Sequence, residues 1–135
     1  MPSGALSLSR FPIINLPLAS VAAGATIILL GRADHGNAYR PLYQHLVIER
    51  LTVTYTPGTS HGTAWTFEGY DGSTKVIDED FVRNAGQQTI TRALDVVIAA
   101  NDAGTPGKLG LELVNPAGST LTSVSVLLEG YLVRV

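Results

Sequence analysis

Apolar and polar residues alternate along much of the chain, a pattern typical of strands with one buried and one solvent-facing side. The pattern is clearest between residues 46 and 77, where it predicts three β-strands joined by two turns. In the first of these strands the apolar positions are Leu51, Val53 and Tyr55. The apolar parity changes at Glu49-Arg50, which predicts a β-bulge there.

Two turn signals divide this stretch. Pro57-Gly58 ends the first strand, and Asp71-Gly72 is a two-residue hairpin signal before the third. Trp65 and Phe67 share one face of the middle strand, so core packing is the favoured interpretation of Trp65.

The same alternation continues in the rest of the chain and predicts further strands near residues 25–30, 89–100, 109–113 and 124–135. A second bulge is predicted at Gly130, where the parity shifts again. One short helix is predicted around residues 78–86, with Asp78 as its N-cap and Gly86 as its end. The expected fold is all-β, an antiparallel β-sandwich or jelly roll of about eight strands.

Residues 1–24 are apolar but interrupted by Pro12 and Pro17, which exclude a regular helix or a central strand. We therefore predict an extended N-terminal arm, followed by a single sandwich domain over residues 25–135. The arm either lies along its own domain as an edge strand or reaches onto another subunit. The candidate interface residues are its large apolar side chains: Phe11, Ile13, Ile14, Leu16 and Leu18.

Composition narrows the function classes. Only 15% of the residues are charged and 45% are hydrophobic. The net charge is −2, whereas a nucleic-acid-binding protein is expected to carry an excess of positive charge, so no nucleic-acid partner is expected. The absence of cysteine excludes disulfides, thiolate zinc sites and a cysteine nucleophile. No apolar run is long enough for a membrane-spanning helix, so no membrane partner is expected.

The chain carries little that predicts catalysis. Residues 58–62 match the G-x-S-x-G nucleophile elbow formally, but a strand follows Ser60 where the elbow needs a helix, so we expect no enzyme. His35, His45 and His61 lack the spacing of a local metal site, and the calcium-loop pattern is absent. We expect neither cofactor nor metal.

An alternative function is carbohydrate binding by exposed aromatic residues with polar neighbours. The sugar-contact candidates are Tyr39, Arg40 and Tyr70. This alternative describes either a free β-sandwich module or a component of a viral receptor-binding apparatus.

The apolar arm, the sparse charge, the Thr/Ser/Gly-rich strands and the lack of cysteine together give the chain an overall character. In that character it resembles small capsid decoration proteins and jelly-roll capsid proteins of bacterial viruses. The resemblance implies a structural virion protein assembled in the host cytoplasm, and it implies a homo-oligomer, most commonly a trimer, that also contacts other capsid subunits. No motif carries the resemblance, so it transfers no site residue.

Overall fold

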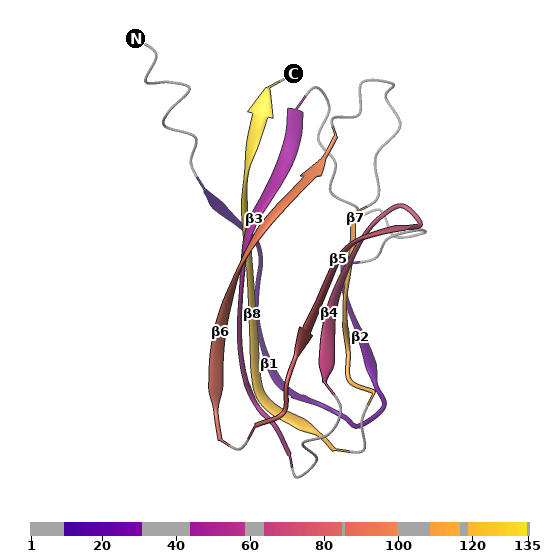
Figure 1. Cartoon of the computed structure of the whole chain (residues 1–135), viewed down its shortest axis with the longest axis vertical. Helices are drawn as coiled ribbons and strands as arrows, with labels where there is room; N and C mark the ends of the chain where they lie inside the picture. The colour runs from indigo at the N-terminus through magenta and orange to yellow at the C-terminus, as the bar shows by residue number, and fades with distance from the viewer. Residues whose placement is uncertain are drawn as a thin grey trace.

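A computed structural model describes residues 10–30, 44–58, 64–84, 86–99, 109–116 and 119–134. These residues form eight β-strands in two four-stranded antiparallel sheets that pack face to face (Figure 1). The first sheet contains β1 (Phe11–Val21), β8 (Leu121–Arg134), β3 (Gln44–Thr56) and β6 (Gln88–Ile98), in that order. The second contains β2 (Thr26–Leu30), β7 (Leu109–Val114), β4 (Trp65–Asp71) and β5 (Thr74–Phe81).

The pairing of strands defines the topology. β1 pairs with β8, β2 with β7, β3 with β6 and β4 with β5, while β3·β8 and β4·β7 complete the sheets. A long hairpin that is folded over on itself produces this nesting of early and late strands, which is the arrangement of a jelly roll. The predicted all-β sandwich is confirmed.

The core lies between the two sheets and consists of the inward-facing residues of alternate positions. Trp65, the first residue of β4, is fully buried in it, and the centre of its ring lies 4.6 Å from that of Phe81 and 5.0 Å from that of Tyr55. Aliphatic residues of β3, β7 and β8 complete it: Leu46, Ile48, Leu51, Val53, Leu109, Leu111, Leu113, Val124, Val126 and Leu128. The interpretation of Trp65 as a core residue is confirmed.

The register of the first sheet shifts where the sequence predicted the first bulge. Glu49 is the extra residue in β3, between the pairs Ile48↔Gly130 and Arg50↔Glu129. The predicted bulge at Gly130 is wrong in its position, because near Gly130 the extra residues lie in β1 and β3, whereas the irregularity that β8 itself carries lies between Thr122 and Ser125. Gly130 lies between them, and a Cβ there would overlap the carbonyl oxygen of Val47. Glycine leaves room for the bulging neighbour.

The predicted helix over residues 78–86 is wrong. Residues 74–81 form β5, and residues 82–84 have no regular structure. A helix of one or two turns has few internal hydrogen bonds, whereas the strand pairs with β4 and buries Ile77 and Phe81. Within the described ranges there is no helix long and apolar enough to cross a membrane.

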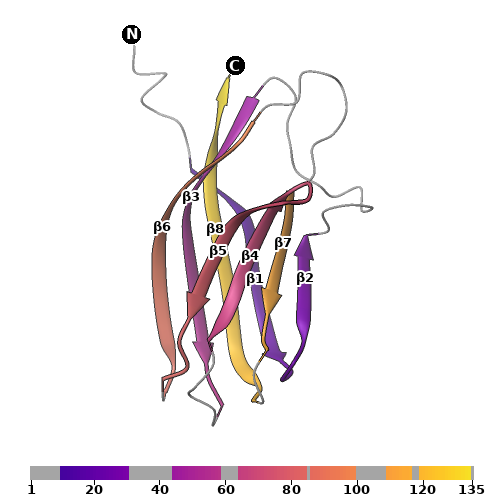
Figure 2. The same cartoon turned by 45° about the vertical axis from the view of Figure 1, so that its right-hand side comes forward.

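Residues 11–21 of the predicted arm form β1, the edge strand of the first sheet. β1 pairs with β8 along its length, so this segment follows the first of the two alternatives for the arm, an edge strand of its own domain. In Figure 2 it descends beside β8 and turns into β2 at the lower end of the sandwich. Residues 1–9 lie outside the described residues.

Candidate interaction surface

A buried polar cluster lies at the end of the sandwich where β1 joins β2, β5 joins β6 and β7 joins β8. Its members are Arg83, Asn115 and Ser119, exposed by 1%, 0% and 8%. The Arg83 guanidinium donates to Asn115 Oδ1 and, over 3.0 Å, to Ser119 Oγ. Burial lowers the pKa of Arg83 from its ordinary value, because the charged form loses solvation.

Asn115 connects this cluster to the other loops at the same end. Its Nδ2 donates to the carbonyl oxygens of Val21 and Ala22, each at 3.1 Å, and to that of Ser119 at 3.0 Å. Gly58, after β3, lies so close to Ser119 that a Cβ would come within 2.9 Å of its Cβ. The cluster therefore fixes four connections to one another, which is a structural role.

A second bridge joins the sheets at their β5 and β6 edges. Arg92 of β6 donates to Glu79 Oε1 at 2.9 Å and to the carbonyl oxygen of Asp80 at 3.1 Å. Its guanidinium carbon lies 4.7 Å from the centre of the Phe81 ring. Arg92 is an inward-facing position of β6, so it covers the core at this open side of the sandwich.

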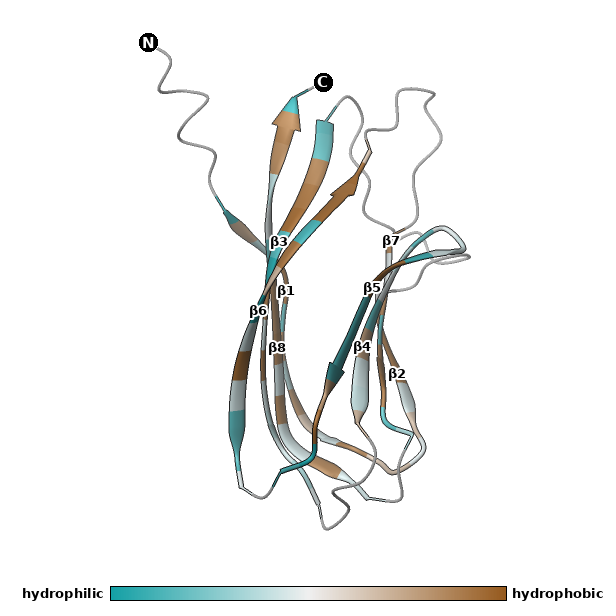
Figure 3. Cartoon of the chain, viewed as in Figure 1, coloured by the Kyte–Doolittle hydropathy of each residue, from teal (hydrophilic) through white to brown (hydrophobic). Residues whose placement is uncertain are grey.

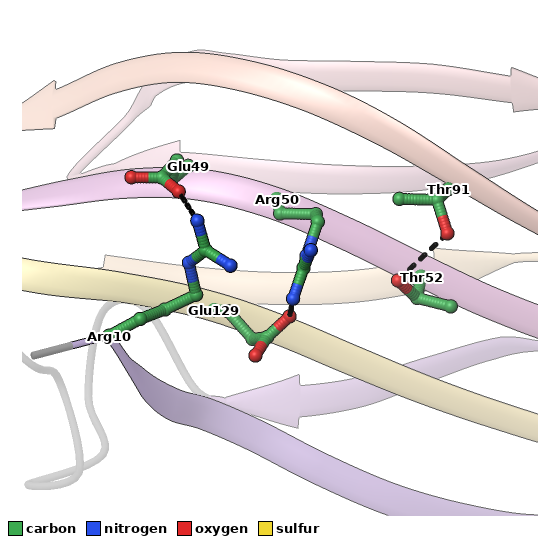
Figure 4. Close-up of polar contacts among 6 residues, drawn as sticks. All are labelled: Arg10, Glu49, Arg50, Thr52, Thr91 and Glu129. Atoms are coloured by element: carbon green, nitrogen blue, oxygen red, sulfur yellow. Dashed lines mark hydrogen bonds and ion pairs between the residues drawn. The ribbon is translucent and has the colours of Figure 1, made fainter.

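The outer face of the first sheet carries three bands of side chains, and the middle band consists of ion pairs (Figure 4). Arg50 of β3 binds Glu129 of β8 through Nε and Nη2, at 2.8 and 2.7 Å. Arg10, just before β1, binds Glu49 of β3. Because the bulge places Glu49 and Arg50 next to each other, two cations and two carboxylates cancel within this band.

The second band on this face is a ladder of hydroxyl groups. The Oγ1 atoms of Thr52 and Thr91 are 3.1 Å apart, and those of Thr54 and Thr89 are 3.0 Å apart. Each pair faces across β3 and β6, so the threonines satisfy part of their hydrogen-bonding capacity without water. This ladder makes the lower part of the face polar but uncharged.

The third band is apolar and lies toward the upper ends of β3, β6 and β8, where Figure 3 shows brown segments. Val47 is directly opposite Val97 on one side and Tyr131 on the other. Val97 is 53% exposed, and Val47 and Tyr131 are half-buried. The outer face of the first sheet thus combines an apolar band with two ion pairs and with Asp95, which is exposed on β6.

The outer face of the second sheet differs in charge. Glu68 is directly opposite Asp78 on β5 and Glu112 on β7, and Asp80 lies in the neighbouring row. Lys75 is the cation beside them, with its Nζ 3.5 Å from Glu68 Oε2. This face is therefore acidic.

Glu68 and Tyr70 interact on this acidic face. Burial raises the pKa of Glu68, but the hydrogen bond from the Tyr70 hydroxyl, at 2.7 Å, and the charge of Lys75 outweigh it, so the net pKa is lowered. The same hydrogen bond raises the pKa of Tyr70.

The candidate interface residues of the arm do not point outward as one patch. All five are half-buried, and all except Leu16 pack against the core cluster. Ile14, Leu16 and Leu18 lie opposite buried residues of β8, on the inward side of an edge strand. Their predicted role in binding a neighbouring subunit stays a prediction.

The sugar-contact candidates are not brought together by the described structure. Tyr39 and Arg40 lie outside the described residues, as do His35, Ser60 and His61. Tyr70 is half-buried on the acidic face, where Lys75 Nζ lies 5.9 Å from its ring centre. Within the part of the chain that is described, no three histidine, aspartate or glutamate side chains are placed to hold a metal ion.

Two features escaped the sequence analysis. Arg83 lies within the residues predicted to be helical, and neither it nor Asn115 was identified as buried, whereas both are buried members of one cluster. A signal existed for Arg83, which continues the inward alternation of Ile77 and Phe81. The second feature is the hydroxyl ladder, because nothing in the sequence pairs Thr52 with Thr91 or Thr54 with Thr89.

Comparison with known proteins gives only distant likenesses. No family model matches the chain, and no curated protein matches it. Among solved structures, that of infectious bursal disease virus Gt strain has a TM-score of 0.44 at 16% identity, covering 96% of this chain and 38% of that one. T=1 particles derived from infectious bursal virus give 0.42 at 15% identity, covering 95% of this chain and 37% of that one.

A cellulose-binding domain is also similar. It is the N-terminal domain of β-1,4-glucanase C from Cellulomonas fimi, with a TM-score of 0.34 at 15% identity, covering 86% of this chain and 76% of that one. The chain spans less than two fifths of the viral chains quoted above. Likenesses of this strength assign neither family nor function.

Proposed function

We propose that this chain is a non-enzymatic structural subunit of an assembled particle, a capsid or capsid-decorating protein of a virus, that acts through contacts between subunits. The observation that carries the proposal is the outer face of the first sheet. There an apolar band, formed by the half-buried Val47 and Tyr131 and the exposed Val97, adjoins two ion pairs whose own charges cancel, with Asp95 of β6 exposed on the same face.

The physical reason is the cost of removing charge from water. Protein interfaces are depleted of charged residues at their centres and enriched in aromatic ones. An approaching partner covers Arg50 and Glu129 as a pair already joined, so neither ion is left without its counter-charge. Burial of the apolar band supplies the favourable free energy of binding, at about 25 cal/mol per Å² of apolar area.

The half-buried apolar residues of β1 support the same proposal. Ile14, Leu16 and Leu18 face inward but stay partly accessible at the edge of the sandwich. Jelly rolls occur in both viral capsid and lectin domains, so the fold by itself is an analogy that favours neither. The surface chemistry, not the fold, carries the argument.

The test is the mass of the native particle in solution, measured by analytical ultracentrifugation. We expect a stable homo-oligomer, a trimer in the simplest case. Val47→Lys places a charge in the apolar band on the central strand β3 and is expected to abolish assembly. Its matched control is Ile28→Lys, an aliphatic residue 59% exposed on the acidic face, which is expected to leave assembly intact.

Circular dichroism must show both variants folded. A native chain that is monomeric at every concentration would contradict the proposal and favour the sugar-binding alternative. If Val47→Lys and Ile28→Lys lost assembly to the same extent, the outer face of the first sheet would not be the interface.

A further inference from the structure

The sandwich has four edge strands, and three of them carry features that oppose pairing with another strand. β1 contains Pro12 and Pro17, which lie opposite Glu129 and Ser125 of β8. These partners have the same parity, so both prolines occupy the same kind of ladder position. Proline has no N–H and is tolerated in a sheet where that position faces away from the partner strand, so the free edge of β1 lacks two donors.

The two edges of the second sheet are protected in other ways. β2 has only five residues, and a short edge offers few hydrogen bonds. β5 carries Lys75, Asp78 and Asp80 on its outer side and Glu79 on its inner side. Charged side chains along an edge oppose the approach of a second strand.

β6 has fewer of these features. It is eleven residues long, contains no proline, glycine or lysine, and pairs with β3 on one side as the last strand of the first sheet, with a register shift between Ala93 and Val96. In Figures 1 and 2 it is the outermost strand of that sheet. Its charged residues are Arg92, which binds Glu79, and Asp95. A long, weakly charged edge of this kind is a template for strand pairing.

We propose that β6 pairs antiparallel with β6 of a second copy of this chain, about a two-fold axis through Ala93, and so joins two first sheets into one of eight strands. This inference rests on the proposed function and names one contact by which the subunits assemble. Residues opposite each other in an antiparallel pair share a face, so only residues of equal parity can be partners.

Charge excludes two of the neighbouring registers and is compatible with this one. Centring on Ala93 places Asp95 opposite Thr91, whose hydroxyl can donate to the carboxylate, and Arg92 opposite Leu94. Centring on Arg92 or on Asp95 places that residue opposite its own copy, and like charges directly opposite are destabilising.

The same register matches apolar residues. Ile90 faces Val96 on the inward side, and both are half-buried in the single chain. Val97, 53% exposed, is brought opposite Thr89. The pairing would therefore cover apolar surface as well as satisfy the backbone groups of the edge.

The first test uses the absence of cysteine from the chain. In Ala93→Cys the two thiols face each other across the axis, with Cα atoms about 5 Å apart, a separation that a disulfide spans. Mild air oxidation, with oxygen as the oxidant, should yield a covalent dimer. In the control Thr89→Cys the thiols are roughly 26 Å apart across the axis, so no cross-link should form.

The second test exchanges charges at the axis. Ala93→Lys and Ala93→Asp each place like charges opposite each other and should weaken the β6 contact by roughly tenfold or more. An equimolar mixture of the two variants should restore it. Ala93 is exposed, so neither substitution disturbs the core.

The outcomes separate the two proposals. If the native chain assembles but Ala93→Cys does not cross-link, or cross-links no faster than Thr89→Cys, the β6 contact is refuted and the proposed function stands. If the native chain is monomeric, the proposed function fails and the β6 contact fails with it.

Discussion

The buried cluster at one end of the sandwich and the outer face of the first sheet use the same kinds of polar contact at different depths. In the cluster, Arg83 and Asn115 are at most 1% exposed. On the outer face, Arg50 is paired with Glu129, yet its side chain is 41% exposed. Both sites join segments that are far apart in the sequence, so exposure is the main difference between them.

That difference separates stability from recognition. A buried polar group that loses its partner pays a desolvation penalty of about 1–3 kcal/mol, and more when it is charged. An exposed ion pair contributes about 0–1 kcal/mol, because water replaces a lost partner. The cluster therefore holds the fold, whereas the outer face can change at little cost and is available to a partner.

The largest effect is expected in the cluster. Asn115→Ala removes one acceptor of the buried Arg83 and the donor to three carbonyl oxygens, so it should destabilise the fold by about 3 kcal/mol. The measurement is urea unfolding followed by tryptophan fluorescence of Trp65. The matched change on the outer face is Thr52→Ala, with an expected loss below about 0.5 kcal/mol. Similar losses at both positions would contradict the comparison.

A smaller effect on stability, but a clear effect on assembly, is expected for the ion-pair band. Arg50→Gln leaves Glu129, 16% exposed, without this partner and makes the face more negative. Stability should fall by less than about 1 kcal/mol, while the mass in solution shifts toward monomer. The double variant Arg50→Gln/Glu129→Gln restores the native net charge of the face and should recover assembly. A double variant as impaired as the single one would show that this charge balance is not what matters.

The smallest effect concerns the acidic face. The lowered pKa of Glu68 means that its contribution to stability is present above the pKa of the unfolded carboxyl and is lost as the pH falls through the lower, folded pKa. Tyr70→Phe removes the hydrogen bond that helps lower it, so the Glu68 pKa should rise, with a stability loss below about 1 kcal/mol at neutral pH. NMR titration of the Glu68 side chain measures the shift. Assembly should not change, since this face is not the proposed interface.

Features that depend on neighbouring residues in the sequence were predictable. The alternation of Leu51, Val53 and Tyr55 identified β3, and the parity change at Glu49-Arg50 located its bulge, because side-chain direction in a strand is set locally. The mistaken helix shows the limit of local signals. Asp78 and Gly86 are suitable caps, but pairing of β5 with β4 decides the outcome.

Features that depend on which strands are neighbours were not predictable. Arg83 and Asn115 are 32 residues apart and meet only because β5 and β7 flank β4 in one sheet. For the same reason, the sequence did not show that the domain has room for the apolar side chains of β1, although most of them pack against its core. The outer face of the first sheet could not be predicted without the strand order either, because its bands of side chains run across β8, β3 and β6.

The position of β8 has a consequence for how the protein is made. β8 lies between β1 and β3 in the first sheet, yet it is translated after both of them. At roughly 5–20 residues per second, β1 waits several seconds for its partner to leave the ribosome. During that interval its apolar side chains have no strand to pair with, so a newly made chain is exposed to chaperones and to aggregation until residues 121–134 emerge.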